Sequence, residues 1–124
     1  MIEVSRVVDA PPERVWELLV DTAEWSNWGA SVREVEASDR WIKAGSTGRV
    51  KTPIGWLKFE IDEFREGEYW SWKVAGVRAT GHRVEEVEDG SGTKVTFELP
   101  VLAAPYAPVC RHALRRIAEL VEKP

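Results

Sequence analysis

The sequence predicts an α+β fold in which a curved antiparallel β-sheet wraps around a long C-terminal α-helix, with two short helices after the first strand. Three observations predict this class. Apolar residues alternate with polar ones through much of the segment 31–99, as in half-buried strands. Short turns join these strands, which favours an antiparallel meander. The segment from about 105 to 122 changes to helical spacing, so a helix covers the apolar face of the sheet.

The chain opens with a strand and then changes its period. The stretch IEVSRVV at 2–8 is short and rich in β-branched residues, which predicts a strand. In the following DAPPERVWELLVD, Pro12 suits a first helical turn because the N–H that proline lacks would be unpaired there. The apolar face of this helix comprises Val15, Trp16, Leu18 and Leu19.

A second, short helix is predicted by Asp21 and Glu24, whose three-residue spacing is typical of a helix start. Trp25 and Trp28 lie three residues apart on this helix and therefore share one face. Two such large apolar side chains in a polar segment indicate core residues that hold the short helix down.

Six further strands are predicted after Gly29, and the second and third form a hairpin that turns at 53–55. In the second arm of that hairpin Leu57, Phe59 and Ile61 alternate with charged residues. The predicted strands fall within 31–37, 47–52, 56–64, 69–77, 78–88 and 94–101. The helix that follows has the apolar face Cys110, Ala113, Leu114, Ile117, Leu120 and Val121.

The bulk composition narrows the function. A length of 124 residues predicts one domain, 1–124, and the net charge of −4 disfavours binding to nucleic acid or to an anionic membrane surface. A single cysteine, Cys110, leaves no internal disulfide, which favours a cytoplasmic protein. We see no signal peptide, and the longest apolar run, 99–110, is shorter than the ~20 residues of a membrane span.

Two stretches resemble a known superfamily. IEVSRVVDAPPERVWELLVDTAEWSNW at 2–28 and HRVEEVEDGSGTKVTFEL at 82–99 are similar to the opening and the late hairpin of START/Bet v 1-like (SRPBCC) proteins, in particular the polyketide cyclase/dehydrase and lipid-transport group. The order of elements agrees over the whole chain. The resemblance implies a helix-grip fold with a hydrophobic cavity between the sheet and the C-terminal helix, and it implies that Trp25 and Trp28 plug or line one end of that cavity. The superfamily includes aromatase/cyclases, lipid and steroid carriers and plant hormone receptors.

Strand parity, helix periodicity and the family layout together predict which residues line this cavity. The first hypothesis is that they bind a small hydrophobic or aromatic molecule, with apolar residues supplying affinity and a few polar ones orientation. The predicted ligand-binding residues are Trp28, Phe59, Trp72, His82, Phe97, Tyr106 and Cys110.

Two of these residues are candidates for catalysis. His82 has the strand parity of Thr80 and Val84, so it is expected to point inward, where it serves as a general acid or base, hydrogen-bonds a ligand, or is a buried histidine with one partner. Tyr106 offers a hydroxyl at the cavity mouth or plugs it. A cyclase or dehydratase using His82 or Tyr106 for proton transfer is therefore the first alternative function. A closed-core protein-interaction module is the second.

Other chemistries are set aside. Arg78 shares the parity of His82 and either meets a ligand carboxylate or is a solvated strand end. Cys110 and His112 do not face each other on a helix, so no common zinc site is available, and we expect no metal and no cofactor. Phosphate-loop and nucleophile-elbow motifs are absent from the sequence.

Trp56 has the opposite parity from Leu57 and is predicted to be a surface aromatic, the contact of a homodimer.

Overall fold

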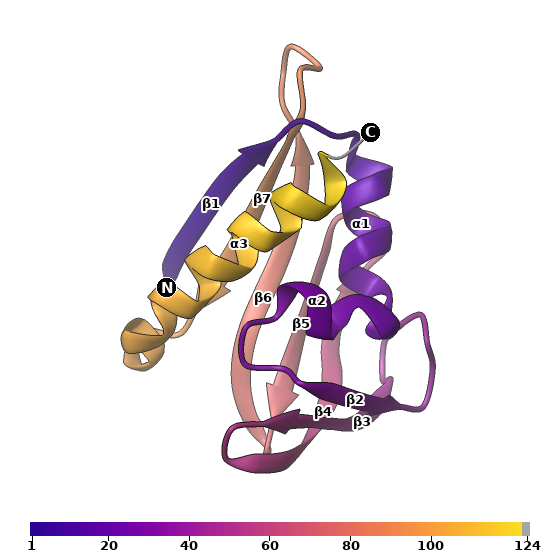
Figure 1. Ribbon diagram of the computed structural model, residues 1–124, viewed down its shortest axis with the longest axis vertical. Helices are drawn as coiled ribbons and strands as arrows, with labels where there is room; N and C mark the ends of the chain where they lie inside the picture. The colour runs from indigo at the N-terminus through magenta and orange to yellow at the C-terminus, as the bar shows by residue number, and fades with distance from the viewer. Residues whose placement is uncertain (123–124) are drawn as a thin grey trace.

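The computed structural model describes residues 1–122. Its strands form one seven-stranded antiparallel sheet in the order β1-β7-β6-β5-β4-β3-β2, and α3 lies across one face of it (Figure 1). This arrangement confirms the predicted α+β helix-grip class. The elements are β1 (Ile2–Val8), α1 (Pro12–Val20), the 3₁₀ turn η1 (Thr22–Glu24), α2 (Trp25–Trp28), β2 (Glu34–Ala37), β3 (Thr47–Thr52), β4 (Gly55–Arg65), β5 (Tyr69–Val74), β6 (Val77–Glu86), β7 (Thr93–Leu99), the 3₁₀ segment η2 (Val101–Tyr106) and α3 (Ala107–Val121).

The C-terminal helix buries its apolar face against the sheet and the N-terminal helices. Its buried residues recur every three or four positions, which is the period of one helix face, and α3 packs against β1, β7, α1 and α2. Pro105 lies within the irregular segment η2, and α3 then begins at Ala107 with Pro108 in its first turn, where the N–H that proline lacks would be unpaired anyway. The buried residues of α3 are Ala107, Cys110, Ala113, Leu114, Ile117, Ala118 and Val121.

The two early tryptophans fasten α2 to the end of α1. Trp25 and Trp28 are 1% and 6% exposed, and their indole N–H groups donate to the carbonyl oxygens of Leu19 at 2.9 Å and Leu18 at 3.3 Å. Both carbonyls belong to the last turn of α1, whose C=O groups have no intrahelical partner. The tryptophans therefore satisfy orphaned backbone groups as well as filling the interior.

The predicted helix start at Asp21 is a 3₁₀ turn held by an ion pair. The Asp21 carboxylate accepts the N–H of Ala23 at 3.0 Å and a two-pronged pair of hydrogen bonds from Arg40, each at 3.0 Å. The guanidinium of Arg40 and these hydrogen bonds hold the pKa of Asp21 below its usual range. Arg40 thus ties the loop before β3 to the short helices.

A β-bulge changes which residues of β6 face inward. Trp70 is opposite His82 and Ser71 is opposite Gly81, but Lys73 is then opposite Arg78 because β6 contains one extra residue. Cross-strand partners share a face, so the register places Arg78 with Lys73 on the outer face. The prediction that Arg78 has the parity of His82 is therefore wrong, because the regular alternation is interrupted.

The remaining turns follow the sequence closely. The predicted hairpin turn at 53–55 joins β3 to β4. The strand expected at 69–77 ends earlier, because Ala75 and Gly76 adopt φ of 53° and 76°, the left-handed values of a two-residue hairpin turn. Trp56 is half-exposed beneath the guanidinium of Arg49, 4.3 Å from the ring centroid. A dimer contact at Trp56 stays a prediction.

Candidate functional site

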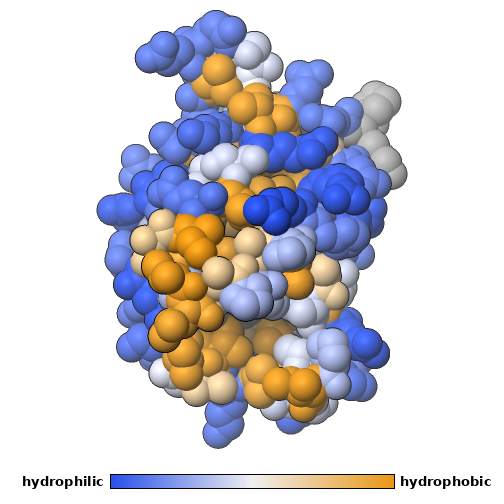
Figure 2. Space-filling model, turned by 90° about the vertical axis from the view of Figure 1, so that its left-hand side faces the viewer, coloured by the Kyte–Doolittle hydropathy of each residue, from blue (hydrophilic) through white to orange (hydrophobic). Residues whose placement is uncertain are grey.

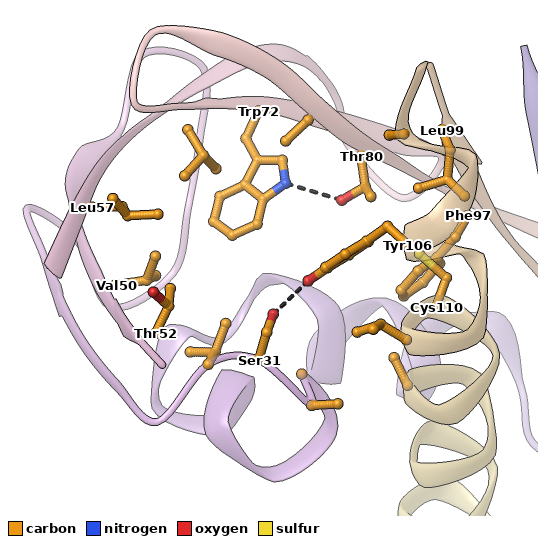
Figure 3. Close-up of a pocket in the computed structure, with 18 of the residues that line it drawn as sticks. Ser31, Val50, Thr52, Leu57, Trp72, Thr80, Phe97, Leu99, Tyr106 and Cys110 are labelled. Atoms are coloured by element: carbon orange, nitrogen blue, oxygen red, sulfur yellow. Dashed lines mark hydrogen bonds between the residues drawn. The ribbon is translucent and has the colours of Figure 1, made fainter. Parts of the chain in front are cut away.

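A cavity of about 550 Å³ lies between the inner face of the sheet and the helices. Strands β3 to β7 form its wall, while α2 with the loop that follows it and the segment η2–α3 close it from the other side (Figure 3). Small-molecule sites in proteins occupy roughly 300–1,000 Å³. The cavity therefore has the size of a ligand site, and the helix does not fill the space it spans.

One end of the cavity is a packed aromatic cluster. Trp70 is 1% exposed and lies between two partners: the ring of Trp25, stacked at 5.5 Å between centroids, and the ring of His82, at 3.9 Å. Phe97 meets His82 edge-on at 4.7 Å. Offset and edge-to-face pairs of this kind add to the free energy gained by burial. This end is closed, with rings in fixed orientations.

Three side chains of the wall form a chain of hydrogen bonds. The indole N–H of Trp72 donates to Oγ1 of Thr80 at 3.0 Å (Figure 3). Thr80 Oγ1 also lies 2.9 Å from Nε2 of His82. Nδ1 of His82 lies 3.2 Å from the carbonyl oxygen of Trp70. A carbonyl only accepts, so Nδ1 of a neutral His82 carries the proton, and Nε2 accepts the hydroxyl hydrogen of Thr80. Both ring nitrogens are thereby occupied within the protein.

Three titratable side chains of the lining, His82, Cys110 and Tyr106, are electrically neutral near pH 7. Burial lowers the pKa of His82 to about 3, against the weaker effect of its hydrogen bond to the Trp70 carbonyl. Burial raises the pKa of the Cys110 thiol to about 11 and also raises the pKa of the Tyr106 phenol. A neutral histidine, a protonated thiol and a phenol present dipoles to the cavity but no charge.

The opposite end of the cavity is open and carries hydroxyl groups. Ile54, Val77 and Tyr106 line the cavity and are also exposed to solvent, so the cavity reaches the surface at the β3–β4 turn, the start of β6 and the start of α3. The hydroxyls of Tyr106 and Ser31 are hydrogen-bonded to each other (Figure 3). This bond links the loop after α2 to the N-terminal end of α3.

The structure brings six of the seven predicted lining residues to this one cavity: Trp28, Trp72, His82, Phe97, Tyr106 and Cys110. The seventh predicted residue, Phe59, does not border the cavity. It has the expected inward parity but packs behind the wall, with its ring 5.3 Å from that of Trp25 and 5.7 Å from that of Trp72.

Sequence reasoning did not assign three polar residues of the lining, Ser31, Thr52 and Thr80. The Thr52 hydroxyl is used within the β3–β4 turn, where it donates to the carbonyl oxygen of Gly55. Thr80 carried a signal, because its parity matches that of His82, yet it was used only to orient the histidine. Ser31 carried none, because it lies in a loop where no periodicity predicts the direction of a side chain. No residue set among 1–122 groups three or more His, Cys, Asp or Glu side chains so that they could hold a metal ion. None of the helices in that range is long and apolar enough to cross a membrane.

Comparisons with known proteins agree with the fold. A protein of Bacillus halodurans superposes with a TM-score of 0.77 at 16% identity, covering 98% of this chain and 96% of the other. The Aha1 dimer of Colwellia psychrerythraea gives 0.70 at 17% identity, covering 98% and 97%. A protein of Chromobacterium violaceum gives 0.67 at 20% identity, covering 99% and 97%. No curated protein matches the sequence at a significant level.

The family assignment comes from the sequence itself. The model of the family described as polyketide cyclase/dehydrase and lipid transport matches residues 1–122, which is nearly the whole chain. The match agrees with the helix-grip sheet, the long final helix and the cavity between them. The chain therefore belongs to the polyketide cyclase/dehydrase and lipid-transport family of the START/Bet v 1-like superfamily.

Proposed function

We propose that this protein binds an uncharged, largely apolar small molecule in the cavity between the sheet and α3. The observation that carries the proposal is the charge of the lining. Among the described residues that border the cavity there is no Asp, Glu or Lys, and the one arginine, Arg78, borders it at the open end beside Val77, where the register pairs it with the exposed Lys73. An ion transferred past this end into the interior of the cavity would lose its hydration without gaining a charged partner.

The hydroxyl groups at the open end suit a ligand with one oxygen-containing group. Two hydroxyls that share a hydrogen bond use one hydrogen between them, so the Ser31–Tyr106 pair keeps a second hydrogen for donation. At the closed end both ring nitrogens of His82 are already hydrogen-bonded. We therefore expect the ligand to place its apolar part against Trp72 and Phe97 and its oxygen near Tyr106.

The cyclase or dehydratase alternative gains no support from the titratable groups. A general acid or base works best when its pKa lies near the working pH. Burial moves the pKa of His82 to about 3 and that of Tyr106 upward, so both move away from neutrality. Binding without proton transfer is the function that these environments favour.

The first experiment compares two ligands with the same ten-carbon chain, one with a neutral head group and one with a charged head group. The neutral dye Nile red reports cavity binding by its fluorescence, and decanol and decanoate compete for it at pH 7.5. We expect decanol to displace the dye at a concentration about tenfold or more below that of decanoate, because the carboxylate must be desolvated without a partner. Equal competition, or stronger competition by decanoate, would contradict an uncharged ligand.

A matched pair of variants locates the binding. Leu57 points into the cavity and Glu60 is exposed on the same strand, β4 (Figure 3). Leu57→Trp fills the space and should abolish Nile red binding, whereas Glu60→Trp adds the same indole outside and should leave binding intact. Circular dichroism and thermal melts confirm that both variants fold. Dye binding that survives Leu57→Trp would place the site elsewhere.

A further inference from the structure

The open end of the cavity is surrounded by exposed apolar side chains from three separate segments. Ile54 at the β3–β4 turn is 84% exposed, Val77 at the start of β6 is 68% exposed, and Val101 and Leu102 on η2 are 65% and 98% exposed. Ile54 and Val77 also line the cavity. On the face shown in Figure 2, hydrophobic residues gather in the lower half while the upper half is largely hydrophilic. These four exposed side chains, Ile54, Val77, Val101 and Leu102, are called the apolar tips below. So many exposed apolar side chains around one opening indicate an interaction surface.

The same three segments lack acidic residues. The stretches 50–59, 69–84 and 99–118 contain no Asp or Glu, although the chain has 21 of them. Lys73 and Arg78 lie opposite each other beside Val77, and neither forms an ion pair with a carboxylate within the described range 1–122. The exposed Glu60 lies opposite Lys73 on β4, whereas no carboxylate is paired with Arg78 in the described strands, so Arg78 is the cation of the pair without an anion across the sheet. The open end is thus apolar and cationic within an acidic protein.

We propose that this end of the molecule docks on the surface of a phospholipid bilayer, with the cavity mouth facing the lipid headgroups. The apolar tips are separated by the opening, so a rigid protein partner would leave a void between them, whereas fluid lipid fills it. Val101 and Leu102 enter the interface, and Lys73 and Arg78 face lipid phosphates. The proposal goes beyond ligand binding, since it gives an apolar ligand a path that does not cross water.

The local charge explains why the net charge is a poor guide here. A net charge of −4 predicts repulsion from an anionic membrane, but charges more than a Debye length of about 8 Å away are screened at physiological salt. A bilayer that touches the open end is therefore influenced mainly by the charges close to it, Lys73 and Arg78 with Glu60 opposite Lys73, and little by the distant carboxylates. Docking should be stronger on vesicles that contain anionic lipid, and it should weaken with salt.

Vesicle flotation tests the docking without any cavity ligand. The vesicles consist of phosphatidylcholine with or without a quarter of phosphatidylglycerol. The double variant Val101→Ser/Leu102→Ser removes two apolar tips that do not line the cavity, and we expect its partition coefficient to fall about tenfold or more. The control is Val7→Ser, which removes a 57% exposed apolar side chain near the C-terminal end of β1, outside the lining of the cavity. This variant should bind vesicles as well as the wild type does. The variant Lys73→Glu/Arg78→Glu should lose the preference for anionic vesicles.

Each outcome decides the proposal. Wild-type protein that fails to float with either vesicle, or a Val101→Ser/Leu102→Ser variant that floats as well as wild type, overturns it. A concentration-dependent dimer that this variant disrupts, with no flotation, also overturns it and assigns the surface to a second copy of the chain. Nile red binding of the variant in solution should stay at the wild-type level. Loss of flotation with intact dye binding therefore separates docking from the cavity proposal.

Discussion

The two ends of the cavity are built on opposite principles. At the closed end, Trp25, Trp70 and His82 are stacked and almost wholly buried, and each ring touches others of the cluster. At the open end, Ile54 and Val77 are mostly exposed and contact little. The closed end therefore supplies stability and shape, while the open end contributes little to the free energy of folding and is available for recognition. The predictions below are ordered by how strongly they should separate the two ends.

The largest effect should come from emptying the closed end. Trp70→Ala removes the ring between Trp25 and His82, and we expect it to lower the free energy of unfolding by about 3–5 kcal/mol. Val77→Ala at the open end should change it by less than about 0.5 kcal/mol. Urea denaturation followed by circular dichroism measures both values. Similar costs for the two variants would show that the ends do not differ in packing.

The buried histidine should make stability fall in mild acid. The folded pKa of His82 is about 3 and the unfolded value about 6.5, so the unfolded chain binds a proton first as the pH falls. The stabilisation is complete above about pH 6.5 and declines as the pH drops toward 3. By pH 4 the loss from this group is about 3 kcal/mol.

Urea midpoints between pH 7.5 and 5 test this slope, since the shifted carboxylates Asp21, Asp39 and Asp89 titrate below that window. His82→Asn retains an amide donor for the Trp70 carbonyl but does not titrate. Its stability should therefore be lower at pH 7.5 and much less dependent on pH. A wild-type protein with a flat profile over this range would show that His82 is accessible to protons, which would reopen its role in catalysis.

An intermediate effect should come from the hydrogen-bonded chain that lies along the wall. Thr80→Val keeps the shape but removes the oxygen that joins Trp72 to His82. Nε2 of His82 then lies buried without its partner, so unfolding should become easier by about 1–3 kcal/mol. Trp72 is half-buried and can bond water instead. Serine at the same position restores the hydroxyl and should recover most of the loss in the same urea measurement.

The difference between the ends also explains what the sequence could predict. The strands, the final helix and six lining residues follow from alternation and helical spacing, because a regular backbone carries side-chain direction along its length. The exceptions lie where the backbone is irregular. The bulge in β6 moves Arg78 to the other face, and the loop position of Ser31 gives no direction. Phe59 shows a further limit, since an inward parity does not tell whether another ring, here Trp25 or Trp72, stands between a residue and the cavity.

The smallest change in stability, with the clearest change in kinetics, is expected at the Ser31–Tyr106 hydrogen bond. Tyr106→Phe removes the bond between the loop after α2 and the start of α3 but keeps the ring. Tyr106 is 39% exposed, so the freed Ser31 hydroxyl can bond water and the free energy of unfolding should fall by less than about 1 kcal/mol. With that link gone, the mouth opens more readily, and stopped-flow mixing should show faster entry and release of Nile red at nearly unchanged affinity. Ser31→Ala breaks the same bond from the other side and should give the same rates. Unchanged rates in both variants would mean that the dye passes between Ile54 and Val77 instead, so the gate would lie on the strand side of the opening.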